Sequence, residues 1–388
     1  MRNRFYNRKK SPVSHSLETE IPISLNFSVA PTICNVSLAI LKYDKDFAHS
    51  FTFDDCLISA LTSGYKVLAG GVADDSITYP ALYYTDGCGN SKLFRAGIAY
   101  YTVNSSGSDI HISTPSYLSY SQINTLKSAG WSIMNHSWSH ANGTGDTPGY
   151  SGVGHPTYAV EIENNRLALV ANIGEAWPHF IVPAGDLAYD PYVVAAGMKA
   201  IYNQAGANYY GGTGGFQLDG IGFESPMRIF RVFRQETDTY PTVKNFIDAV
   251  ASKSINGAKF WFNDATHSLT PALFNGGMTV ADFASYMGYV ASTYGAAGSD
   301  RVWMAPLQDV WEYVNLRENT RLEIPLFTTT TQAVISLFHA VPTTDSKTFG
   351  WTLKITSDQN ISSVSVPTGY AATFKGTGTN KIINVEKV

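Results

Sequence analysis

Two short polar strings, each closing an apolar strand-like run, constrain this chain more than any other feature. The first is Thr52–Asp55 (TFDD) and the second is His136–His140 (HSWSH). Together they supply two adjacent carboxylates and two imidazoles spaced four residues apart. Such a set can bind one divalent metal and leave one carboxylate free to accept a proton. Few purely structural arrangements need this combination, so the sequence indicates metal-assisted hydrolysis.

The adjacent acids follow an apparent strand, where two buried carboxylates repel each other unless a cation is present. A metal resolves this repulsion, because one carboxylate can bind it while the other stays ionised as a base. An isolated Asp-Asp pair is more often a turn or a helix cap. The apolar run before the pair and the histidines elsewhere favour the metal site.

The histidines His136 and His140 would lie on one side of a helical turn, or meet at a strand-to-loop junction. Alone, the pattern H-x-x-x-H is common by chance. Beside Asp55 it gains weight, because two histidines and one carboxylate leave coordination positions open for water and substrate. Open positions are typical of catalytic rather than structural metal sites.

The middle of the chain alternates between short apolar runs and helical patterns. We expect strands at 48–53, 97–103, 131–134, 179–182, 208–210, 228–233, 258–262 and 301–304. We expect helices at 121–129, 158–173, 191–205, 242–252, 280–294 and 307–317. This alternation predicts an α/β fold with parallel strands and outer helices, closed as a barrel or open as a sheet.

Both ends of the chain differ from this middle part. Strand-period alternation in 21–42 is broken by Pro31. The segment 321–388 is rich in Thr, Ser, Val and Ile, with Gly and Pro between short runs. The second pattern predicts a small all-β sandwich. The expected segments are a basic polar tail 1–20, an N-terminal β segment 21–47, an α/β barrel 48–320 and a C-terminal β-sandwich 321–388.

The charge balance narrows the classes of partner. A net charge of −4 argues against nucleic-acid binding by the body of the protein. The first ten residues contain five basic and no acidic side chains. A solvated tail explains them most simply, and an arm that docks on an acidic protein partner is the sharper alternative.

The sequence contains no apolar stretch long enough to cross a membrane, and no apolar core of a secretory signal is visible. Cys34, Cys56 and Cys88 form no paired zinc signature and allow at most one disulfide. We nevertheless expect an extracellular, cell-surface or virion-associated protein.

The two motifs resemble those of the polysaccharide deacetylases with a NodB-homology domain, carbohydrate esterase family 4. TFDD is similar to the first motif of that family and HSWSH to the second. The segments GIAYYTV and SYSQINTLKSAGWSIMN, which precede HSWSH, also resemble the family, and the likeness covers roughly residues 48–317. It implies a distorted (β/α) barrel and a metal-dependent hydrolase that removes N-acetyl or O-acetyl groups from a polysaccharide or oligosaccharide.

The resemblance implies roles for individual residues. Asp54 would be the base, and Asp55, His136 and His140 would bind the metal, most simply Zn²⁺. The third motif of the family is matched only in part around Pro183, where its arginine is missing and Ala184 replaces an aromatic residue. The backbone N–H of Ala184 can still hold an oxyanion.

The missing arginine leaves open what orients Asp54. Arg228, Arg231 or Arg234 could substitute, although each is more simply a surface or ion-pair residue.

The last motif of the family ends a strand with a histidine that acts as general acid. In this chain Asn263 stands at the expected position, and His267 is our candidate for the acid, displaced along the loop. Asp264 could orient it. Trp261 could line the sugar site, with a packed barrel aromatic as the simpler interpretation.

A second hypothesis comes from another class of function. The altered third and last motifs, the basic tail and the β domain fit a glycan-binding or structural module of a surface or virion assembly that keeps the fold without turnover. A polysaccharide lyase or glycosidase fits less well, because it would need carboxylates across a sugar bond and no histidine pair.

Overall fold

Seven parallel strands close into a ring within the part of the chain that the computed structural model describes. That part comprises residues 18–104, 106–141, 157–205, 215–217, 227–254, 258–270, 277–324, 331–343 and 346–388. In ring order the strands are β3 (Phe47–Phe53), β8 (Gly97–Tyr100), β9 (Ser132–Asn135), β10 (His179–Ile181), β11 (Ala200–Ala205), β13 (Met227–Phe233) and β14 (Phe260–Thr266). Pairing of β14 with β3, from Phe260 opposite Phe47 to Thr266 opposite Phe53, closes the barrel.

Two further strands extend the ring. β17 (Val302–Met304) pairs parallel with the first half of β3, and β12 (Gly215–Gln217) pairs antiparallel with β14. Every residue of β3 is buried, as expected for a strand of a parallel sheet that is covered on both faces. The expected α/β barrel is therefore confirmed.

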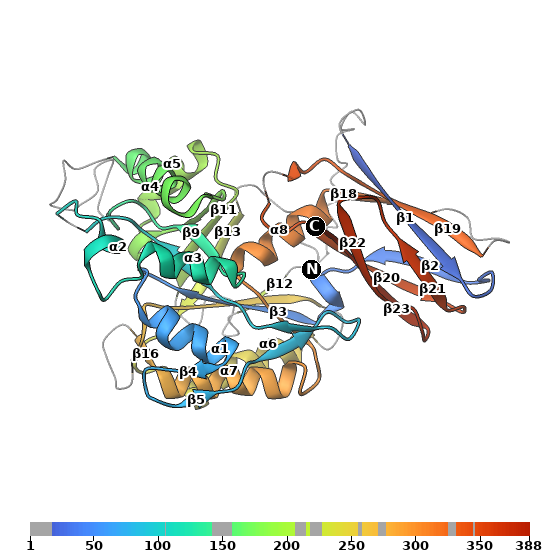
Figure 1. Ribbon diagram of the computed structural model, residues 1–388, viewed down its shortest axis with the longest axis horizontal. Helices are drawn as coiled ribbons and strands as arrows, with labels where there is room; N and C mark the ends of the chain where they lie inside the picture. The colour runs from blue at the N-terminus through green and yellow to red at the C-terminus, as the bar shows by residue number, and fades with distance from the viewer. Residues whose placement is uncertain are drawn as a thin grey trace, which may run out of the picture.

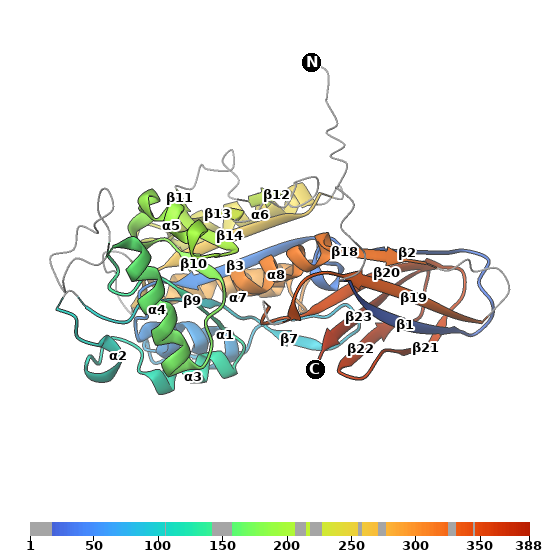
Figure 2. The same cartoon turned by 90° about the horizontal axis from the view of Figure 1, so that it is seen from above.

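Helices surround the barrel (Figures 1 and 2). The longer ones are α3 (Tyr120–Ser128), α4 (Tyr158–Ile173), α6 (Tyr240–Lys253), α7 (Val280–Tyr294) and α8 (Leu307–Glu318). The shorter ones are a π-helical turn (Ala60–Tyr65) continued by α1 (Lys66–Ala69), α2 (Ile110–Ser113) and α5 (Asp190–Ala195). Among the described residues, no helix combines the length and the apolar character that a membrane crossing requires.

Sequence signals explain where the helices begin and end. Ser119 and Gln122 form a reciprocal capping box at the start of α3, and Thr157 caps α4. Gly174 ends α4 at a φ of 80°, a left-handed conformation that glycine adopts without strain. α4 coincides with the expected helix 158–173.

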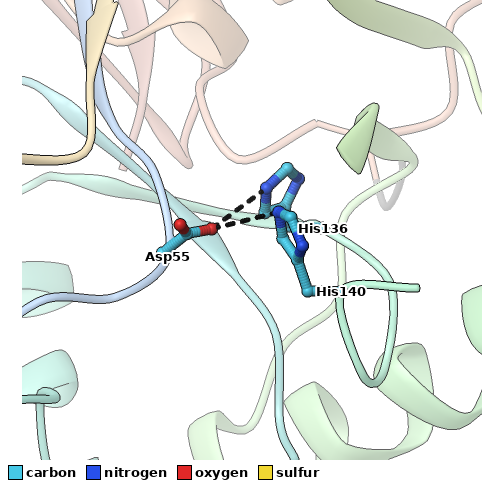
Figure 3. Close-up of side chains that lie close together, drawn as sticks. All are labelled: Asp55, His136 and His140. Carbon is cyan, nitrogen blue, oxygen red and sulfur yellow. Dashed lines mark ion pairs between the residues drawn. The ribbon is translucent and has the colours of Figure 1, made fainter. Parts of the chain in front are cut away.

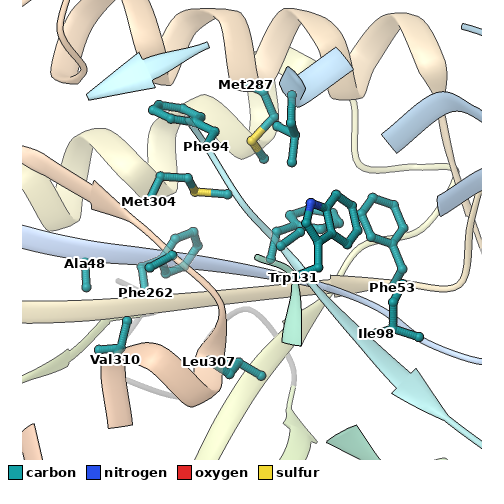
Figure 4. Close-up of a cluster of buried hydrophobic side chains, with 14 of the residues drawn as sticks. Ala48, Phe53, Phe94, Ile98, Trp131, Phe262, Met287, Met304, Leu307 and Val310 are labelled. Atoms are coloured by element: carbon teal, nitrogen blue, oxygen red, sulfur yellow. The ribbon is translucent and has the colours of Figure 1, made fainter. Parts of the chain in front are cut away.

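Aromatic side chains fill the space between the barrel and its helices. Phe53 stacks on Trp131 with ring centroids 5.7 Å apart, and Phe283 of α7 meets Phe53 edge-on. Figure 4 shows Phe53, Trp131 and Ile98 side by side, with Met287 packed from the helical layer. This cluster lies directly beneath the strand that carries the first motif.

One expected element is wrong and another is displaced. The predicted helix 191–205 stops at Ala195, because Gly197 adopts a φ of 73° and residues 200–205 form β11 between β10 and β13. The strand expected at 258–262 is β14, which continues to Thr266 because it pairs with β3 along its whole length. The strand expected at 208–210 lies outside the described residues.

The β-sandwich takes strands from both ends of the chain. One sheet has the order β18 (Thr320–Glu323), β19 (Gln332–His339), β1 (Thr19–Phe27) and β21 (Ile361–Ser365). The other has β2 (Cys34–Leu38), β20 (Gly350–Ser357), β23 (Asn380–Lys387) and β22 (Tyr370–Lys375). Alternate side chains of β1 and β19 face a shared core that includes Trp351. The segments 21–47 and 321–388 therefore meet in one sandwich.

Short paired strands complete the described part. These are β4 (Gly71–Val72) with β5 (Thr78–Tyr79), β6 (Tyr83–Thr85) with β7 (Ser91–Leu93), and β15 (Ser268–Thr270) with β16 (Gly277–Thr279). The three cysteines are free thiols. Most of the basic tail precedes the first described residue.

A buried glutamate joins the barrel to the segment that leads into the sandwich. Glu312 of α8 accepts hydrogen bonds from the backbone N–H and the hydroxyl of Thr348, at 2.7 and 3.0 Å. Burial raises the pKa of Glu312 from its ordinary 4.5 to about 7, and the nearby Asp309 carboxylate adds to the rise. The folded chain therefore favours the protonated form of Glu312.

This arrangement predicts the pH dependence of stability. Between pH 4.5 and 7 the folded chain keeps a proton that the unfolded chain has lost, so the contribution of Glu312 to the free energy of unfolding falls as the pH rises. The loss should be about 3 kcal/mol across that range. Urea unfolding of the wild type and Glu312→Gln at several pH values checks it, with Glu323→Gln on exposed β18 as control. Parallel pH curves for wild type and Glu312→Gln would contradict the prediction.

Candidate metal centre

The first motif sits at a sharp turn where β3 ends. The backbone N–H of Asp54 donates to the carbonyl of Thr266, which extends the β3–β14 pairing by one residue. Asp55 and Cys56 then adopt φ values of 69° and 56°, both in the left-handed region that is costly for residues other than glycine. Buried Cys56 is held in place as its thiol donates to the carbonyl of Ala99 at 3.4 Å. Because of this turn, the side chains of Asp54 and Asp55 point to different partners.

The second motif forms a loop rather than a helical turn. β9 ends at Asn135, and Ser137 and His140 adopt left-handed φ values of 66° and 54°. The carboxamide oxygen of Asn135 accepts the backbone N–H of Ser137 at 3.0 Å. Of the two arrangements that the spacing allowed, the strand-to-loop junction is the one present.

The helix α4 fixes the shape of this loop from behind. Glu161, which is fully buried, accepts the backbone N–H groups of Trp138 and Ser139 at 2.9 and 2.8 Å. Its other oxygen accepts the Ser139 hydroxyl at 2.7 Å. Asn165, one turn further along α4, donates to the side chain of Asn135 at 2.9 Å. Glu161 was not predicted from the sequence, although an acid in the first turn of the following helix is a visible signal.

These turns bring Asp55, His136 and His140 together (Figure 3). The Oδ1 atom of Asp55 lies 3.4 Å from Nε2 of His136 and 3.3 Å from Nε2 of His140. One ligand atom from each residue lies within 4.8 Å of the others. Residues from two distant motifs therefore converge as the sequence predicted.

The protonation of the three side chains suits a metal. The Nδ1 of His136 lies 2.8 Å from the carbonyl of Ile181, so it donates there and leaves the Nε2 lone pair facing Asp55. Burial lowers the pKa of His140 despite the neighbouring Asp55, which favours its neutral form. Burial opposes ionisation of Asp55, yet the imidazoles around it lower its pKa overall.

The donor set fits a tetrahedral divalent ion such as zinc. Ligand bonds of about 2.0–2.1 Å in that geometry place ligand atoms about 3.3 Å apart. The separations of 3.4 and 3.3 Å around Asp55 agree with this value. The Oδ1 of Asp55 is also buried without a hydrogen-bond donor in the described part of the chain, which is costly for a carboxylate that binds nothing.

Asp54 is held by an arginine from another strand. Arg231 of β13 donates to both oxygens of Asp54, at 2.7 and 3.0 Å, and both side chains are buried. A bidentate guanidinium keeps a buried carboxylate ionised and fixes its orientation. Of the three arginines that could replace the missing one, Arg231 is the residue that contacts Asp54. Arg228 instead pairs with Asp190 at the surface.

His267 reaches the site because it follows β14 directly. Its Nε2 lies 3.4 Å from Oδ2 of Asp55, and its ring packs against Phe233 with centroids 4.5 Å apart. With 37% of its side chain exposed, it stands between the centre and solvent. Since β14 ends at Thr266, His267 closes a strand, and Asn263 lies within that strand.

Two expected supporting roles do not fit. Asp264 is fully buried and accepts from Arg234 at 2.6 Å and from Tyr286 at 2.8 Å, so its carboxylate faces the helical layer and is committed there rather than to orienting His267. Trp261 is fully buried and donates to Ser50 at 2.9 Å. It packs inside the barrel and cannot line an exposed sugar site.

The turn Pro183–Gly185 follows β10 at the same end of the barrel. Pro183 is buried, and Ala184 is exposed with a φ of 50°. The turn keeps the position that the partial third motif predicted, while the oxyanion role of Ala184 stays a prediction.

The hydrogen bonds between Glu161 and the loop that carries both histidines predict that a substitution of Glu161 alters metal binding. Glu161→Ala should weaken zinc binding about 10- to 100-fold, because the loop that carries both histidines loses its three hydrogen bonds to the carboxylate. Glu161→Gln should retain most of the affinity, since its amide can accept both N–H groups and donate to Ser139. Titration against a chromophoric zinc chelator measures this, with exposed Glu163→Ala on the same helix as control. Unchanged affinity in folded Glu161→Ala would refute the role.

Residues 102–208 match the family model described as polysaccharide deacetylase. This segment contains His136, His140 and Ala184 and stops short of Arg231 and His267. A search of curated proteins gave no significant match.

Three solved structures show weak similarity. The deacetylase PplD of Streptococcus pyogenes in complex with acetate has 15% identity and a TM-score of 0.28, and the match covers 41% of this chain and 59% of that chain. The deacetylase domain of BpsB from Bordetella bronchiseptica has 13% identity and a TM-score of 0.30, with 47% of this chain and 69% of that chain covered. A family 4 carbohydrate esterase from Streptomyces lividans in complex with acetate has 14% identity and a TM-score of 0.29, with 56% of this chain and 91% of that chain covered. The chain thus spans less than two thirds of the first of them.

The family match contains the second motif and the strand and helix around it. Residues 102–208 are therefore similar to the polysaccharide deacetylases.

Proposed function

We propose that this protein is a zinc-dependent hydrolase that removes acetyl groups, N-linked or O-linked, from a polysaccharide or oligosaccharide. The observation that carries the proposal is the Asp55–His136–His140 cluster with Asp54 beside it in sequence and His267 across it. A bound divalent ion would supply Lewis-acid polarisation of the acetyl carbonyl and would lower the pKa of water to about 7.

Asp54 would act as the general base. Its bidentate pairing with Arg231, at 2.7 and 3.0 Å, fixes the orientation of the carboxylate, so that an oxygen lone pair can accept a proton from the attacking water.

His267 would act as the general acid. Its partly exposed imidazole, 3.4 Å from Asp55, can deliver a proton to the departing amine or alcohol on the solvent side of the centre. The N–H of Ala184 would stabilise the developing oxyanion from the β10 side. General acid and base contributions are each worth roughly 10²–10⁴ in rate.

A mostly apolar cavity of about 290 Å³ is lined by residues that follow the first motif and His267 along the chain. Leu57 and Ile58 follow the first motif, and Ser268 and Leu269 follow His267; all four line this cavity. It would offer space for part of an acetylated sugar. A glycan substrate would place the protein outside the cell, at a cell surface or on a virion.

Acetate release is the direct test. The purified protein with zinc should release acetate from N-acetylated or O-acetylated oligosaccharides, and chelation should abolish release until zinc is restored. Asp54→Asn should lower kcat at least about 10²-fold while zinc still binds with a stoichiometry of one. Asp75→Asn, at a surface carboxylate that bonds Tyr79, is the control.

A wild type that binds zinc and glycan yet releases no acetate from any member of a broad panel would contradict the enzyme. That result would favour the binding or structural module instead.

A further inference from the structure

A basic hollow lies where the barrel meets the sandwich. It has a volume of about 570 Å³, within the range of small-ligand sites. The β6–β7 hairpin and the segment before β8 form one side, and the chain around Phe349 with the end of β23 forms the other. Its charged lining residues are Lys42, Lys92, Arg95, Lys347, Lys387 and Glu386.

The charges around this hollow are unbalanced. Five cationic side chains face one carboxylate, although the chain as a whole carries a net charge of −4. Lys42 pairs with Glu386 at 2.8 Å, and Arg95 pairs with buried Asp309 at 3.0 Å. The other three cationic residues of the lining are lysines.

Lys92, Lys347 and Lys387 form no ion pair with any described residue. The ammonium of Lys347 donates to the carbonyl of Trp131 at 2.5 Å, and that of Lys92 lies 5.9 Å from the ring centre of Tyr43. These contacts orient the two cations. Carboxylates lie near them without forming ion pairs: Asp309, Glu175 and Glu312 near Lys347, and Glu386 near Lys92. Like charges gathered in one hollow repel each other, and a bound anion would relieve the repulsion.

The walls of the hollow also present aromatic faces. Tyr83 is 40% exposed, and Phe349 and Tyr43 are buried deeper. Flat apolar rings with a polar edge suit the faces of a sugar ring. An inorganic ion alone would not need them.

The hollow is separate from the metal centre. Arg95 precedes β8 and Ala129 precedes β9, so they lie at the amino ends of the barrel strands. The metal ligands follow the carboxyl ends of β3 and β9. A four-residue strand is about 13 Å long, so one sugar unit cannot occupy both places.

We propose that this hollow binds an anionic sugar unit, with its carboxylate or phosphate held among Lys92, Lys347 and Lys387. The choice of a sugar rests on the proposed function, whereas the requirement for an anion does not. Such a site would hold a distant part of a long acidic glycan, or a second glycan chain, while the metal centre acts elsewhere.

Calorimetric titration tests the proposal with three probes: a galacturonic acid trimer, glucose 6-phosphate and neutral maltotriose. Binding of either anion with at least tenfold preference over maltotriose supports the site, and the stronger anion identifies the charge carrier. The double variant Lys92→Glu with Lys387→Glu should weaken that binding more than tenfold. Lys253→Glu with Lys375→Glu, at exposed lysines outside the hollow, should leave it unchanged.

Failure of this proposal is distinguishable from failure of the proposed function. Asp55→Asn should abolish zinc binding and leave anion binding intact, while the Lys92/Lys387 variant should release acetate from short neutral substrates at the wild-type rate. Wild type that binds neither anion better than maltotriose overturns the proposal. Equal loss of binding in the two double variants would also overturn it, because the effect would then be one of net charge.

Discussion

The register between β3 and β14 is the constraint on which the rest of the site depends. It places Phe53 opposite Thr266, so Asp54 begins its turn where His267 leaves the barrel. A slip of one residue would send every side chain of a strand to the other face. The buried faces of β3 and its full-length pairing with β14 prevent that slip. Closure of the barrel therefore brings the first motif and His267 to the same place.

Three buried or partly buried carboxylates at this end of the barrel have different partners. Arg231 neutralises Asp54 inside the barrel, and Arg234, three residues later, neutralises Asp264 in the helical layer. Asp55 instead faces imidazoles. Since imidazoles can be neutral, this carboxylate is the one able to share a metal cation. The distribution of arginines thus separates the proposed base, the scaffold carboxylate and the proposed metal ligand.

The sequence was most informative where chemistry and local pattern agreed. The two motifs, the helix α4 and the last barrel helices were predictable from strand-like runs, caps and periodicity. The convergence of Asp55 with His136 and His140 was predictable because two histidines and one carboxylate form a typical catalytic metal site only when they lie together. The roles of Asp54, Ala184 and His267 remain predictions that follow from position.

Long-range pairing accounts for what the sequence did not reveal. The polar residues Asn263 and Asp264 seemed to end a strand, yet pairing with β3 and the ion pair to Arg234 keep them inside β14. The turn at Gly197 divided an expected helix, and β1 joined a sandwich whose other strands lie at the opposite end of the chain. None of these partners is close in sequence.

The proposed function requires that Asp55, His136 and His140 bind one divalent metal. Diffraction data from zinc-soaked crystals, collected on both sides of the zinc absorption edge, test it most directly. We predict a single anomalous peak about 2 Å from Asp55 Oδ1 and from Nε2 of each histidine. Density for all three side chains with no anomalous peak between them, at saturating zinc, would contradict the account.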